Sequence, residues 1–176
     1  TLVVIDDSIV RGTTLEKSIL RMLNRLQPKK IVVVSSAPQI RFPDCYGIDM
    51  SRLGDFVAFR AVIQLLKEQG NDYLLGEVYE QCLQAKANKE PVNYVKRLFE
   101  QFSDEEISAK IADIVRPSEM TADLEIVFQT VQNLHKAIPD HSGDWYFTGN
   151  YPTRGGALVA NQAYLNYMDG KLVRAY

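Results

Sequence analysis

The fold is decided by one stretch of sequence, Thr1-Leu2-Val3-Val4-Ile5-Asp6-Asp7-Ser8-Ile9-Val10-Arg11-Gly12-Thr13-Thr14. Residues 2–5 are an unbroken apolar run of mostly β-branched side chains, which predicts a parallel strand buried on both faces. Two carboxylates, Asp6 and Asp7, follow at the point where this strand should end. Open α/β sheets bind their ligands at that edge. The acidic pair is therefore a candidate site.

A short turn containing Gly12 leads from the acidic pair into a helical pattern, in which one face carries Leu15, Ile19, Met22, Leu23 and Leu26. Thr13 and Glu16 have the spacing of a capping box, so we expect the helix to begin there. A helix start reached through a glycine turn offers N–H groups and the positive dipole end to an anion. The pattern predicts a phosphate loop, with the alternative that the acidic pair only caps a turn.

The loop is neither a Walker A loop nor a dinucleotide fingerprint, because it lacks Gly-Lys-Ser/Thr and the second and third glycines. Residues 5–14 instead resemble the phosphoribosylpyrophosphate (PRPP) motif of type I phosphoribosyltransferases. The form Ser-Ile-Val-Arg-Gly-Thr-Thr resembles the glutamine PRPP amidotransferase (amidophosphoribosyltransferase) family in particular. Two later segments resemble the same family, namely Ala37-Pro38 with Pro43 and Tyr46 to Asp49, and Phe147 to Pro152.

This resemblance implies a reaction and a set of site residues. Members of the family displace pyrophosphate from C1 of PRPP with ammonia from a glutaminase domain, which gives 5-phosphoribosylamine in the first step of de novo purine synthesis. Asp6 and Asp7 would be catalytic, holding the ribose hydroxyls and Mg²⁺ through hard oxygen ligands. PRPP, with its 5′-phosphate, would be bound by Asp6, Asp7, Ser8, Arg11, Gly12, Thr13 and Thr14.

The cysteines argue against a metal cluster. In one branch of the family a Cys-x-x-Cys pair precedes Phe-Thr-Gly-x-Tyr-Pro and ligates a 4Fe-4S cluster. Here Gly143 and Tyr146 occupy those positions, Asp44 stands where that branch has another cysteine, and Cys45 is one place late. We therefore expect no iron–sulfur cluster. Cys45 and Cys82 are too few for a disulfide framework, and we expect Cys82 to be packed in a helix.

The rest of the chain predicts an α/β fold, and the resemblance implies a partial type I phosphoribosyltransferase with a Rossmann-like parallel sheet and an added helical region. Residues 31–34 form a second buried strand and complete a βαβ unit. We expect one helix to start near Pro91, a second helix to be capped by Ser103 and Glu106, and a third helix to be capped by Thr130. A short strand is expected at 124–128.

We expect three parts: residues 1–50 are the C-terminal part of the phosphoribosyltransferase core with the PRPP loop, 51–117 a helical insertion, and 118–176 a C-terminal helix and tail. Arg41 and Asp49 are secondary site candidates, whose alternatives are a solvated cation and a turn carboxylate. His135 and His141 are six residues apart across a proline break, so we expect no helical metal pair, and we expect both on the surface.

The composition excludes several classes of protein. The chain has 176 residues, 46% of them hydrophobic, with a net charge of -2 and both signs interspersed, so it has no electrostatic footprint for nucleic acid. It has no apolar run of membrane-spanning length and no signal peptide pattern, so we expect no membrane association and a cytoplasmic location.

The sequence opens inside a strand without an initiator methionine, and we expect it to be a piece of a longer protein. The glutaminase domain and the pyrophosphate loop of the family are absent from it, so the chain alone should not turn over. The parent would be a homo-oligomer subject to purine nucleotide feedback. Two alternatives stay open, a base-salvage phosphoribosyltransferase and a non-catalytic PRPP-binding regulator.

Overall fold

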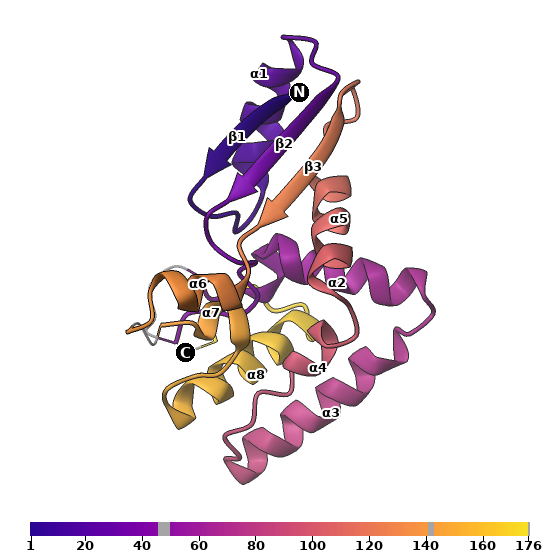
Figure 1. Ribbon diagram of the computed structural model, residues 1–176. Coiled ribbons are helices and arrows are strands. Elements are labelled where there is room, and N and C mark those ends of the chain that lie inside the picture. Colours follow the sequence, from indigo (N-terminus) through magenta and orange to yellow (C-terminus); the bar gives the residue numbers. More distant parts are fainter. Residues whose placement is uncertain (46–49, 141–142, 176) are drawn as a thin grey trace.

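The computed structural model describes residues 1–45, 50–140 and 143–175 and contains a three-stranded parallel sheet in the order β1-β2-β3. The strands are β1 (Leu2–Asp6), β2 (Lys30–Ser35) and β3 (Asp123–Phe128). All three arrowheads point toward the helical part of the molecule, so the carboxyl ends of the strands meet there (Figure 1). This arrangement confirms the expected α/β fold of a partial type I phosphoribosyltransferase.

Helices account for most of the remaining structure. The chain continues from β1 into a π-helical turn, η1 (Leu15–Ile19), and α1 (Leu20–Asn24). Between β2 and β3 lie a 3₁₀ turn, η2 (Leu53–Asp55), and the helices α2 (Val57–Glu68), α3 (Tyr73–Asn88), α4 (Lys96–Phe99) and α5 (Asp104–Val115). After β3 come α6 (Val131–Ala137), α7 (Trp145–Thr148) and α8 (Arg154–Met168). In the described ranges we find no helix with the length and apolar character of a membrane span.

The two faces of the sheet have different surroundings. The inner face contributes Ile31, Val33 and Ile126 to the hydrophobic core, together with residues of η1, α1 and α5. Right-handed crossovers put the helices of both connections on the same side of a parallel sheet, which explains this one-sided cover. On the outer face, Val3 is 63% exposed and Ile5 is 75% exposed. The expectation that the first strand is buried on both faces is therefore wrong for β1.

The helix after the loop differs from the expected pattern. Its start carries no side-chain cap hydrogen bond, so the capping box expected from Thr13 and Glu16 is not formed. The π-helical turn then shifts the apolar face, because a π turn contains one residue more than an α turn. Leu20 is buried as a result, whereas Met22 is exposed. Leu26, also expected on the apolar face, is exposed as well.

Helix α2 lies at the centre of the helical part. Phe59 is fully buried and packs edge-on against Tyr167 of α8, with ring centroids 4.8 Å apart. Cys82 is buried in α3, as expected. The helix expected to start near Pro91 is reduced to the four residues of α4, since the chain from 90 to 95 is irregular. Helix α8 was not anticipated, although Thr153 caps it by accepting from the Gly156 amide.

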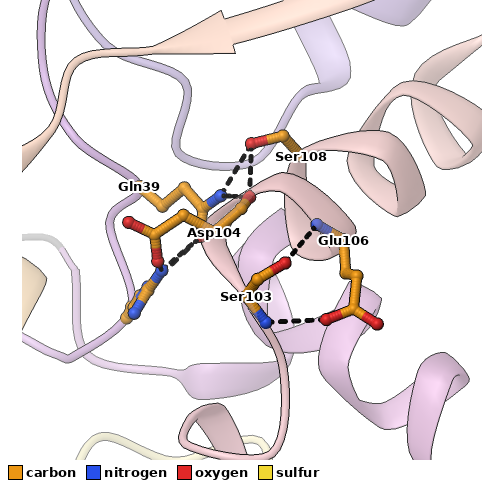
Figure 2. A network of polar contacts seen from close by, with 6 residues as sticks. Gln39, Ser103, Asp104, Glu106 and Ser108 are labelled. Carbon is orange, nitrogen blue, oxygen red and sulfur yellow. Dashed lines mark hydrogen bonds and ion pairs between the residues drawn. The ribbon is translucent and has the colours of Figure 1, made fainter.

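Helix α5 begins with the expected capping box. The Glu106 amide donates to Ser103 Oγ at 3.2 Å, and the Ser103 amide donates to Glu106 Oε2 at 2.8 Å (Figure 2). In the same view Gln39, from the loop after β2, donates from Nε2 to the Asp104 carbonyl and to Ser108 Oγ, both at 2.8 Å. The cap and this buried amide fix the start of α5 against the carboxyl end of the sheet.

Candidate functional site

The acidic pair lies at the carboxyl end of β1, where the sequence placed it. Hydrogen bonds from the residues that follow β2 hold the backbone of this pair. The Ser36 amide donates to the Asp6 carbonyl at 2.9 Å, Ser36 Oγ donates to the same oxygen at 2.8 Å, and the Ala37 amide donates to the Asp7 carbonyl at 3.0 Å. These bonds extend the pairing of β1 and β2 past the end of both strands and fix where the two carboxylates leave the sheet.

Each carboxylate uses one oxygen to cap the turn. The Asp7 amide donates to Asp6 Oδ1 at 2.9 Å, and the Ser8 amide donates to Asp7 Oδ1 at 2.7 Å. Asp6 is half-buried and Asp7 is exposed. The turn-cap interpretation is thus correct for one oxygen of each residue, and it leaves each Oδ2 available for a further ligand.

The turn at Gly12 needs glycine for two reasons. Its φ is +74°, a region that L side chains rarely adopt, and a Cβ atom there would lie 2.7 Å from Val115 Cγ1. The Glu16 amide donates to the Gly12 carbonyl at 2.9 Å, so the helix begins here and its first N–H groups have no acceptor within the helix. A cavity of about 220 Å³ is lined by Asp6 and residues 8–15. Its size and donors suit an anionic group.

The helical part supports the loop at points that the sequence did not indicate. The Val57 amide donates to the Val10 carbonyl at 2.8 Å, and Arg60 Nη2 donates to the Arg11 carbonyl at 2.7 Å. Asp55 lies 3.8 Å from Arg11 Nε. The helical spacing of residues 57–68 indicated only which of their side chains enter the core. The sequence therefore did not predict the polar contacts between α2 and the loop.

A larger cavity of about 510 Å³ lies between α5 and β3, and its lining includes Gln39 and Arg41 but no residue of the loop. The Arg41 guanidinium is committed to structural contacts, because it pairs with Asp104 and lies 5.5 Å from the centre of the Phe99 ring. Arg41 therefore serves to join the β2 connection to the helical part. The candidate site is the smaller cavity, where Asp6 and the glycine turn meet.

Two positions at which the family resemblance places cluster cysteines face each other. Tyr146 Oη donates to Asp44 Oδ1 at 3.2 Å, and the Asp44 residue is only 2% exposed. Burial, with the Asp44 charge next in importance, raises the pKa of the Tyr146 phenol to about 12. These side chains form a polar contact across residues that are far apart in the chain. The absence of an iron–sulfur cluster stays a prediction.

The other candidates are placed as follows. His135 is exposed, as expected, with Nε2 lying 3.1 Å from Asp144 Oδ2. The segment from Tyr46 to Asp49 and His141 lie outside the described residues.

A magnesium ion fits the acidic pair only with help from other ligands. Within residues 1–45, 50–140 and 143–175 we find no group of three or more His, Cys, Asp or Glu side chains arranged around a metal site. Mg²⁺ commonly takes one or two carboxylates and completes its shell with water and substrate oxygens. Asp6 and Asp7 match that pattern, provided that a phosphorylated substrate supplies the remaining oxygens.

The parallel sheet with an acidic pair and a glycine turn at the end of β1 assigns the chain to the α/β class, with a partial type I phosphoribosyltransferase fold. No protein-family model matches the chain.

Curated relatives are similar to part of the chain. The chain is 46% identical over 72 residues to the amidophosphoribosyltransferase of Pasteurella multocida (strain Pm70) and 44% identical over 72 residues to that of Escherichia coli (strain K12). Each match covers 40% of this chain and 14% of the relative. The amidophosphoribosyltransferase of Pyrococcus horikoshii is 38% identical over 74 residues, 42% of this chain and 16% of the relative. The matched segment is amidophosphoribosyltransferase-like, which confirms the resemblance, and it spans about a seventh of those relatives.

Proposed function

We propose that this chain carries the PRPP-binding part of an amidophosphoribosyltransferase. The observation that carries the proposal is the placement of Asp6 and the Gly12 turn around one cavity at the carboxyl end of β1, with Asp7 next to Asp6 in the chain. Helix N–H groups and hydroxyls suit a phosphate, and carboxylates suit ribose hydroxyls and a magnesium ion. The similarity to amidophosphoribosyltransferases supplies the reaction for which both are needed.

In this proposal residues 11–14 bind the 5′-phosphate, through backbone N–H groups and the hydroxyls of Thr13 and Thr14, with Ser8 as a further hydroxyl. Asp6 and Asp7 bind the 2′ and 3′ hydroxyls of the ribose. Their negative charge stabilises the positive charge that develops on the sugar as the bond from C1 to pyrophosphate breaks. Bound Mg²⁺ would neutralise the leaving pyrophosphate. Ammonia then forms the new bond to C1, which yields 5-phosphoribosylamine.

The remaining parts of the reaction lie with the complete protein. Ammonia would come from glutamine through a glutaminase domain, and purine nucleotides would act as feedback inhibitors. We further propose a homo-oligomeric parent, and a division of this chain into a core at 1–50, a helical insertion at 51–117 and a C-terminal part at 118–176. Because the loop supplies only the phosphate and ribose contacts, this segment by itself would be inactive.

Replacement of the acidic pair tests the proposal. Asp6→Asn and Asp7→Asn keep the shape and the capping oxygens but remove the charge, and we expect each to lower kcat in the complete enzyme by about a hundredfold or more. Asp72→Asn is a matched control, since Asp72 is exposed at the start of α3 without a side-chain cap bond. Rates near wild type for both site variants would reduce the pair to turn caps.

A further inference from the structure

Helix α2 contacts the outer side of the proposed phosphate loop through two consecutive carbonyl groups. The Val10 carbonyl accepts from the Val57 amide at 2.8 Å, and the Arg11 carbonyl accepts from Arg60 Nη2 at 2.7 Å. The second contact comes from a side chain whose Nε is buried and has no hydrogen-bond partner among the described residues. The Arg60 guanidinium therefore donates to a neutral loop carbonyl, although half-buried cations normally pair with acidic side chains.

Holding a carbonyl also orients the amide on the other side of the same peptide unit. In a trans peptide the C=O and the following N–H point in opposite directions. The bond from Arg60 to the Arg11 carbonyl thus turns the Gly12 N–H away from α2, and the bond from Val57 to the Val10 carbonyl turns the Arg11 N–H the same way. Successive N–H groups directed to one side make a concave site for anions.

The cavity of the loop lies on the side away from α2. Its lining consists of Asp6 and residues 8–15 and includes no residue of α2. Val57 Cγ2 of α2 and Val115 Cγ1 of α5 occupy the space next to Gly12, at 3.5 Å and 2.7 Å from the position that a Cβ atom would take. The loop is therefore packed on one side and open to a ligand on the other.

We propose that Arg60 is a positioning residue for phosphate binding: it holds the Arg11 carbonyl so that the loop amides face the 5′-phosphate. This rests on the proposed function of the loop. The guanidinium does not touch the substrate. Its positive charge adds to the favourable potential for a phosphate dianion, because the described residues include no acidic partner for it.

Kinetics of the complete enzyme test this role. Arg60→Met keeps the apolar stem and removes the donor, and we expect the KM for PRPP to rise about tenfold while the KM for glutamine stays unchanged, because only the PRPP loop loses its hydrogen bond from Arg60. Arg60→Lys keeps a cationic donor and should lie between wild type and Arg60→Met. Arg97→Met is the matched control, because Arg97 is an arginine of the same helical part that pairs with Glu77 instead of the loop.

The outcome separates this inference from the proposed function. A loop variant, Thr13→Val, should raise the KM for PRPP by itself. If Thr13→Val raises that KM and Arg60→Met stays within about twofold of wild type, the positioning role is overturned while PRPP binding by the loop stands. If neither variant changes the KM for PRPP, both the positioning role and the proposed function of the loop are contradicted. Should the methionine variant not fold, Arg60→Gln gives the same decision, because it removes the charge and shortens the side chain, and an unchanged KM for PRPP in this variant also contradicts the role.

Discussion

The two faces of the sheet are built from the same kinds of side chain and have opposite environments. Ile31 on the inner face of β2 is fully buried under the helices, whereas Ile5 on the outer face of β1 is 75% exposed. On the outer face, Ile5 of β1 lies beside Val34 of β2, and Val34 lies beside Val127 of β3. Val127 is also exposed. The apolar runs of the strands therefore do not reveal which face this chain covers.

The difference shows where the stability of the chain comes from. Apolar side chains contribute when folding removes them from water. The inner face meets this condition through the core cluster that joins it to α1, α2 and α5, and the outer face within the described ranges does not. Substitutions should consequently have large effects on one side of the sheet and small effects on the other.

The largest contrast is expected between two isoleucines on neighbouring strands. Ile31→Ala leaves a cavity beneath the helices and should lower the free energy of unfolding by about 2–5 kcal/mol. Ile5→Ala removes the same atoms from an exposed position and should change it by less than about 0.5 kcal/mol. Urea denaturation of both variants of this chain measures the difference. Equal losses would show that the outer face is covered in solution.

The same contrast between covered and exposed positions applies to polar contacts. Tyr146→Phe removes the donor to the buried Asp44 carboxylate and should cost about 1–3 kcal/mol of stability. His135→Gln disrupts the exposed contact with Asp144 and should cost less than about 1 kcal/mol. Thermal unfolding of the two variants compares them. If Tyr146→Phe unfolds like wild type, the Asp44 carboxylate is satisfied without the phenol.

Much of the fold could be predicted from local patterns. The three strands, the capping box at Ser103 and the cap at Thr130 were each indicated by residues close together in sequence. The acidic pair and Gly12 were found for the same reason, since the strand, the turn and the helix start are consecutive. Elements of this kind depend on neighbouring side chains and on turn geometry, which a sequence displays directly.

The errors arose where distant contacts or backbone irregularity decide the outcome. The π-helical turn from Leu15 to Ile19 shifts the phase of the first helix, so a regular period of 3.6 residues placed Met22 in the core wrongly. Arg60 is 49 residues from Arg11, and no local pattern marks that contact. The outer face of β1 was misjudged because a run of β-branched residues has the same appearance whether or not a layer covers it.

Alkaline pH should destabilise the chain in part through the buried Cys82 thiol, in addition to buried phenols such as Tyr146 whose pKa burial also raises. Burial raises the pKa of Cys82 from 9.0 to about 12, so the folded state holds the proton after the unfolded state has lost it. The contribution is fully present below pH 9 and is lost as the pH rises toward 12, with an effect on the order of 1 kcal/mol at pH 10. Urea titrations at pH 8 and pH 10 should show this decrease in wild type and in Cys45→Ala. A similar decrease in Cys82→Ala would assign it to another group.

The smallest contrast is expected between two helix caps of similar chemistry. Ser103 accepts from the Glu106 amide at the start of α5, which buries four residues, and Thr130 accepts from the Asn133 amide at the start of α6, which buries none. A lost cap costs about 1 kcal/mol when its helix must be intact for the fold to persist. Ser103→Ala should show that full loss in global unfolding. Thr130→Ala should lower the free energy of unfolding by only a few tenths of that amount, because α6 can fray without exposing core side chains.

Amide hydrogen exchange distinguishes the two cases: protection should fall across α5 and the strands in Ser103→Ala, and only within α6 in Thr130→Ala. Equal global losses would mean that α6 is as tightly coupled to the core as α5, and burial would then be a poor guide to coupling in this chain.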